Sequence, residues 1–158
     1  MSHLYLALKL MHVIGATMLF GTGLGIAFFM VMAHRTRDPV VIAHTASIVV
    51  LADAMFTANA VIVQPVSGVY LALGIGYSLW DPWIVASLAL YVLIGACWLP
   101  VLWIQAQMRN LARQAVQEGT DLPARYDRLF RVWFVLGWPA FIGVVAIFVL
   151  MIFKPTLW

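Results

Sequence analysis

The sequence has little charge: Asp, Glu, Lys and Arg together make up 9% of its 158 residues, whereas 65% of the residues are hydrophobic. An average soluble domain carries about 25% charged residues, so a soluble fold of this chain would lack the polar surface to cover its core. The composition therefore predicts an integral membrane protein whose solvent is the lipid bilayer. The formal net charge of +3 is too small to indicate nucleic-acid binding.

Cysteine is almost absent as well, since Cys97 is the single one. This excludes an internal disulfide framework and leaves the redox compartment open. Cys97 is expected to be a packing residue, because no histidine or cation is predicted at its level to activate a thiolate. The sequence also lacks the CxxCH, HExxH, Walker and Rossmann signatures, so no motif assigns a chemistry.

Long apolar runs are what the sequence does have. A membrane-spanning helix needs about 20 mainly apolar residues, and four segments qualify: 4–33, 40–74, 83–107 and 130–153. They predict an all-α fold, a four-helix bundle forming a single transmembrane domain over residues 1–158, with a hydrophilic loop at 108–128. The first two segments exceed a straight crossing, so they must tilt, kink or extend past the lipid, and Pro65 favours a kink in the second.

Local signals predict where the helices begin and end. The pairs Asp38–Pro39 and Asp81–Pro82 are typical of helix starts, with the aspartate as N-cap and the proline as first helical residue. The third helix is expected to continue into water and to stop at Glu118–Thr120, where Gly119 suits a helix C-terminus.

The basic residues are distributed unequally. Lys9 and Lys154 lie on one side, and seven arginines lie in or beside the first and third loops: Arg35, Arg37, Arg109, Arg113, Arg125, Arg128 and Arg131. The positive-inside rule predicts that these loops are cytoplasmic, and that both termini lie outside a bacterial inner membrane. The aromatic turn with Trp80 and Trp83, and Trp158, are then expected at the outer interface.

Polar groups inside a span are costly and indicate a functional site. On the first helix, His12 shares its face with Gly15 and Gly23, where a flat ligand or another helix can approach closely. Lys9 lies one turn nearer the outer surface. A polar stripe on the second helix, within about 40° on a helical wheel, consists of Asp53, Thr57, Gln64 and Ser67.

His12 leaves four hypotheses open. It could be the axial ligand of a b-type haem, hydrogen-bond a quinone, or relay protons with Asp53. It could also simply form hydrogen bonds with the polar stripe that fix helix packing. The haem hypothesis makes His12 the metal ligand and predicts a cofactor site of His12, Lys9, Gly15, Gly23, Gln64 and Trp98.

A non-catalytic alternative is a membrane subunit that binds a partner protein, a quinone or a lipid through the stripe and the Trp/Pro kinks at Trp98 and Trp138. Such kinks open space between helices. A cavity with aromatic walls is one expected outcome, and a bend that improves packing is the commoner one. A homodimer through Gly21 and Gly25, and a membrane redox partner, are further expectations.

Segments 4–16 and 20–25, which contain Lys9, His12 and Gly15, resemble a bacterial family of predicted integral membrane proteins of unknown function. The similarity continues at 50–53, 56–57, 64–65, 96–100 and 123–126, so it covers essentially the whole chain. The resemblance implies membership of that family and a membrane location, and it supplies no activity.

A more distant resemblance is to HemJ-type protoporphyrinogen oxidases and to the membrane domain of copper-resistance D proteins. Lys9 and His12, with His34 near the far end of the helix, are similar to the HemJ opening, whose first-helix histidine is implicated in haem binding. This resemblance implies haem b and an oxidoreductase. HemJ proteins also carry a lysine early in the third helix, in a Trp-x-x-x-Lys context, where this sequence has Trp83 followed by Ser87.

Overall fold

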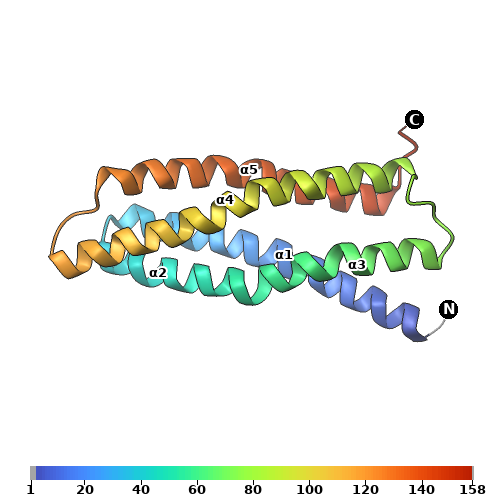
Figure 1. Cartoon of the computed structure of the whole chain (residues 1–158), viewed down its shortest axis with the longest axis horizontal. Helices are drawn as coiled ribbons and strands as arrows, with labels where there is room; N and C mark the ends of the chain where they lie inside the picture. The colour runs from blue at the N-terminus through green and yellow to red at the C-terminus, as the bar shows by residue number, and fades with distance from the viewer. Residues whose placement is uncertain (1–2, 158) are drawn as a thin grey trace.

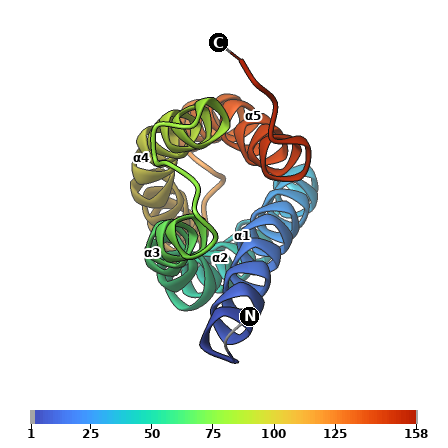
Figure 2. The same cartoon turned by 90° about the vertical axis from the view of Figure 1, so that its right-hand side faces the viewer.

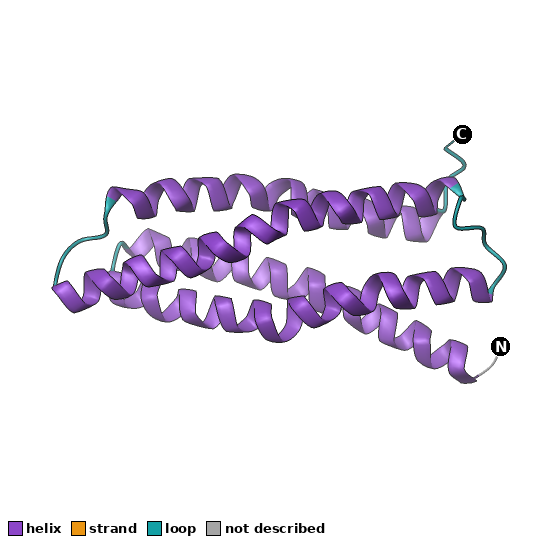
Figure 3. Ribbon diagram, viewed as in Figure 1, coloured by secondary structure: helices purple, strands orange, loops and turns teal. Residues whose placement is uncertain are grey.

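The computed structural model describes residues 3–157. Its elements are α1 (His3–Thr36), α2 (Pro39–Ala52), a short π-helix η1 (Asp53–Thr57), α3 (Ala58–Gly74), α4 (Pro82–Glu118) and α5 (Ala124–Phe153) (Figures 1 and 3). Because α2, η1 and α3 form one continuous rod, the chain makes four spans long and apolar enough to cross a membrane. The predicted all-α membrane bundle is confirmed. Trp158 lies outside the described residues.

The helix ends follow most of the expected signals. The Asp38 side chain accepts a hydrogen bond of 2.8 Å from the Val40 N–H at the start of α2, and Gly119 ends α4 with a positive φ of 65°. Asp81 precedes α4 as expected, but its side chain makes no capping hydrogen bond. α5 begins at Ala124, before the predicted span that starts at residue 130, because the helix extends beyond the part of the chain expected in lipid.

Both termini lie at one end of the bundle, and the connections α1–α2 and α4–α5 lie at the other (Figure 1). At that second end, the Arg37 guanidinium pairs with both oxygens of the Asp127 carboxylate and so joins the α1–α2 connection to α5. Both side chains are partly exposed, so the pair contributes at most about 1 kcal/mol. That this arginine-rich end faces the cytoplasm stays a prediction.

Buried apolar residues gather near the two ends. Close to the arginine-rich end, the core contains Ile26, Met30, Ala33, Ile42, Ala46, Val49, Ile104, Met108, Ala112, Tyr126 and Trp133. Near the termini a smaller cluster contains Ala72, Trp83 and Ile84. Buried apolar side chains therefore lie toward the two ends of the bundle, most of them at the arginine-rich end, and the middle is built differently.

The middle of the bundle contains two irregularities of the second span. In η1 the Ala58 N–H donates to the carbonyl of Asp53, five residues earlier, which widens the helix by a π-turn. Further along, Pro65 has no N–H for the Val61 carbonyl four residues before it. The Tyr91 hydroxyl of α4 donates a hydrogen bond to that carbonyl instead. A polar side chain thus replaces a backbone bond that lipid could not replace.

We expect Tyr91→Phe to destabilise the folded protein by about 1–2 kcal/mol, because the Val61 carbonyl then loses its partner in a low-dielectric medium. In a Pro65→Ala background, residue 65 regains the N–H that pairs with Val61, so the cost of Tyr91→Phe should largely disappear. Unfolding curves of the four proteins in detergent give the double-mutant cycle. Equal costs of Tyr91→Phe in both backgrounds would contradict this role.

Candidate functional site

A cavity of about 360 Å³ lies between the four spans, which form a ring when viewed along the bundle (Figure 2). Every span contributes to its wall, and most of the wall is apolar. The rings of Phe20 on α1 and Phe141 on α5 stack with centroids 5.4 Å apart and close one side of it. The aromatic lining residues are Phe20, Tyr91, Trp98, Trp133, Phe134, Trp138, Phe141 and Phe148.

Three glycines from three helices help to make this space. Gly23 on α1, Gly95 on α4 and Gly137 on α5 all line the cavity. A Cβ atom added at any of them would meet no atom within 4 Å. Larger side chains at these positions would therefore extend into the cavity. The volume of the cavity thus depends on the presence of glycine at all three positions.

One part of the wall is polar. Asp53 and Thr57 on η1 line the cavity, as do Trp98 and Gln105 on α4. The Asp53 side chain lies close enough to those of Thr57, Gln105 and Trp98 to interact with them. Nevertheless, Thr57 Oγ1, Trp98 Nε1 and Gln105 Oε1 are buried and have no hydrogen-bond partner among the described residues. Within residues 3–157 Asp53 also forms no ion pair. The cavity therefore has a polar group of side chains with unused hydrogen-bonding capacity.

His12 lies elsewhere, in the contact between α1 and α3. Its Nδ1 is 2.8 Å from Ser67 Oγ, and its backbone carbonyl accepts a bond of 2.7 Å from Gln64 Nε2. A Cβ added at Gly68 would be 3.2 Å from His12 Cε1, so the ring packs directly on the α3 backbone. These contacts are the ones expected if His12 and the polar stripe fix helix packing.

The structure thus divides the predicted site residues between two places. Gln64 belongs to both, because it binds α1 and also lines the cavity. The exposed Lys9 belongs to neither place. Ser87, which stands where HemJ proteins carry a lysine, is buried, and its hydroxyl donates a hydrogen bond of 2.7 Å to the Trp83 carbonyl. With the cavity lie Gly23, Asp53, Thr57 and Trp98, and with the α1–α3 contact lie His12, Gly15 and Ser67.

Sequence reasoning missed Gln105, Gly95 and Gly137. A signal for Gln105 was present, because it follows Trp98 by seven residues and so lies on the same face of the helix. The two glycines carry no such signal, since a glycine in an apolar span looks the same whether it faces lipid, another helix or a cavity.

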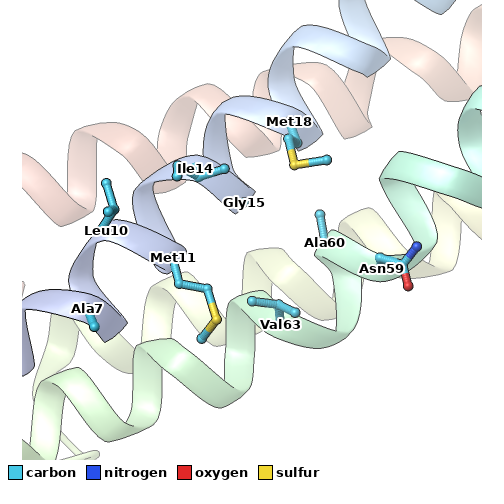
Figure 4. Close-up of a pocket in the computed structure, with 9 residues that line it drawn as sticks. All are labelled: Ala7, Leu10, Met11, Ile14, Gly15, Met18, Asn59, Ala60 and Val63. Atoms are coloured by element: carbon cyan, nitrogen blue, oxygen red, sulfur yellow. The ribbon is translucent and has the colours of Figure 1, made fainter. Parts of the chain in front are cut away.

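A second hollow lies on the outside of α1 and α3 (Figure 4). Its wall includes Leu10, Met11 and Ile14, which are exposed on the surface of the bundle. The one polar side chain that lines it, Asn59, already donates to the Met55 carbonyl. Apart from Asn59 this groove is apolar, so it resembles ordinary lipid-facing surface more than a selective site.

The fold and cavity define a four-span helical membrane protein with a partly open, partly polar cavity between its spans. Residues 6–155 match the family described as predicted integral membrane protein (DUF2269), and the chain belongs to that family. The whole-chain resemblance seen in the sequence is confirmed, whereas the HemJ resemblance stays a prediction. No curated protein and no solved structure matches the chain.

We expect Gly15→Ala to destabilise the protein by about 1–2 kcal/mol, because the added Cβ would displace Gln64 Nε2 and so break its hydrogen bond to the His12 carbonyl. Gly21→Ala is the matched control on the same helix, since a Cβ there meets nothing within 4 Å. Its effect should stay within about 1 kcal/mol. Thermal unfolding in detergent compares the two, and a Gly15 variant as stable as the control would contradict the tight α1–α3 contact.

Proposed function

We propose that this integral membrane protein binds an apolar small molecule of the bilayer, a lipid or a quinone, in the cavity between its four spans. The observation that carries the proposal is the cavity itself, which combines aromatic walls with one polar region. Its volume of about 360 Å³ falls within the range of about 300–1,000 Å³ typical of small-molecule sites.

An energetic argument supports an occupant. Empty volume in a protein interior costs free energy, because the groups that line it lose dispersion contacts. The cavity of about 360 Å³ is also partly open, so molecules of the bilayer can enter it. A molecule that moves from the surrounding lipid into this space would restore the missing dispersion contacts. The polar wall then selects among the apolar molecules that fit.

The test is to measure which lipids and quinones remain bound to purified protein, by organic extraction and mass spectrometry. Gly23→Phe should fill the cavity and lower the retained molecule by about tenfold or more, the effect of losing about 1.4 kcal/mol of binding. Gly21→Phe makes the same change on the same helix outside the cavity lining and should retain the molecule. Equal retention by both variants and the wild type would refute the proposal. Gel filtration of Gly21→Phe also examines the predicted homodimer.

Haem b remains a prediction of the sequence, and the surroundings of His12 decide how well it fits. Ser67 Oγ lies 2.6 Å from the Val63 carbonyl, to which it donates its one hydrogen, so it accepts from His12 Nδ1–H. The remaining ring nitrogen, Nε2, then keeps its lone pair. However, the ring lines neither hollow and packs against Gly68. This packing does not favour a macrocycle at His12, so haem is not part of the proposed function.

We therefore expect no Soret band in the absorption spectrum of protein purified from haem-replete cells, either oxidised or reduced with dithionite. A stoichiometric band that disappears in His12→Ala would establish haem binding at His12 and replace the proposal for this site. The Ser67→Ala variant serves as control for loss of the α1–α3 hydrogen bond alone.

A further inference from the structure

The polar part of the cavity wall shows which headgroup the bound molecule should carry, an inference that rests on the proposed function. Asp53, Thr57 and Gln105 are buried, with exposed fractions of 4%, 7% and 2%, and they line the cavity together with Trp98. Three of their side-chain atoms, and those of no other described residue, are buried without a hydrogen-bond partner. Buried polar atoms are nearly always paired, so this concentration in one place indicates a missing partner.

The unpaired atoms differ in kind. Trp98 Nε1–H can only donate a hydrogen bond, Gln105 Oε1 can only accept one, and the Thr57 hydroxyl can do either. The Asp53 carboxyl adds further acceptor oxygens beside them. A headgroup that satisfies this set must therefore accept and donate at the same time.

This requirement separates the chemical classes. A ketone or ester carbonyl accepts from Trp98 but leaves Gln105 Oε1 unpaired. An ammonium group donates to Gln105 and Asp53 but leaves the Trp98 N–H unpaired. A hydroxyl group accepts through its oxygen and donates through its hydrogen, so it can satisfy both sides at once.

We propose that Asp53, Thr57, Trp98 and Gln105 form a headgroup site for the hydroxyl of an apolar alcohol or phenol from the bilayer. The hydroxyl oxygen accepts from Trp98 Nε1, and its hydrogen is donated to Gln105 Oε1. The hydrocarbon remainder lies along the aromatic wall of α5, which includes Phe134, Trp138 and Phe141. An isoprenoid alcohol and a quinol share this chemistry.

Binding is tested by native mass spectrometry of the full chain in detergent, with geranylgeraniol and its methyl ether as probes. Trp98→Phe should weaken both probes about tenfold, the loss expected for one hydrogen bond in a dry site, because the oxygen accepts in both. Gln105→Leu should weaken the alcohol about tenfold and leave the ether nearly unchanged, because the ether has no hydrogen to donate. Decyl hydroquinone then distinguishes the two sources of the hydroxyl group. Tighter binding of decyl hydroquinone than of geranylgeraniol identifies a quinol, and the reverse order identifies an isoprenoid alcohol.

Stability in the absence of probe separates a binding role from a structural one. Because Thr57 Oγ1 has no hydrogen-bond partner among the described residues, Thr57→Val, which keeps the shape of the side chain, should leave the melting temperature unchanged or raise it. A marked fall in this variant would reveal a partner within the protein and overturn the proposal.

The outcomes keep the two proposals apart. If Gly23→Phe abolishes binding of both probes while Trp98→Phe and Gln105→Leu change neither, the cavity binds apolar molecules but the headgroup site is wrong. If no probe binds and Gly23→Phe retains the same extracted molecule as the wild type, the cavity holds water at most, and the proposed function fails as well.

Discussion

The hydrogen bond from Tyr91 to the Val61 carbonyl connects the irregular second span to the rest of the bundle. In lipid every backbone carbonyl needs a partner from the protein, and Pro65 removes the one that Val61 would have had. The substitute bond fixes the rotation of α4 as well as its distance from α3. Trp98 and Gln105 follow Tyr91 at intervals of seven residues, and a helix drifts by only about 20° per heptad, so the same rotation turns both toward the cavity.

This arrangement explains why the bundle is packed at its ends and hollow in its middle. The apolar cores near each end hold the helices together, while Pro65 and the π-turn keep the second span from packing regularly between them. The space that results stays open because α1, α4 and α5 line it with Gly23, Gly95 and Gly137. The middle of the bundle can accommodate the polar side chains of Asp53, Thr57 and Gln105 because they face the cavity and not the lipid tails.

Composition and local signals were sufficient to predict four spans, the capping by Asp38 and the end of α4 at Gly119, because each depends on a short stretch of sequence. The hydrogen bonds of His12 with the second span were among the alternatives, because the sequence placed His12, Gln64 and Ser67 at about the same depth in the membrane. A cavity with aromatic walls was one of two outcomes expected of the Trp/Pro kinks, but the arrangement of the cavity wall was not predicted. It depends on which faces of four helices meet, and neither Gly95, Gly137 nor the pairing of Tyr91 with Val61 can be derived from helical periodicity alone.

The three cavity glycines have a consequence for the amount of folded protein in a cell. A molecule that fills the space they leave takes the place of core side chains, so its binding free energy adds directly to the free energy of folding. Such linkage grows with the logarithm of ligand concentration, by about 2.7 kcal/mol at a hundredfold excess over the dissociation constant. The resistance of this protein to unfolding and proteolysis would then rise and fall with the lipid composition of its membrane, and the protein would accumulate where its ligand is abundant.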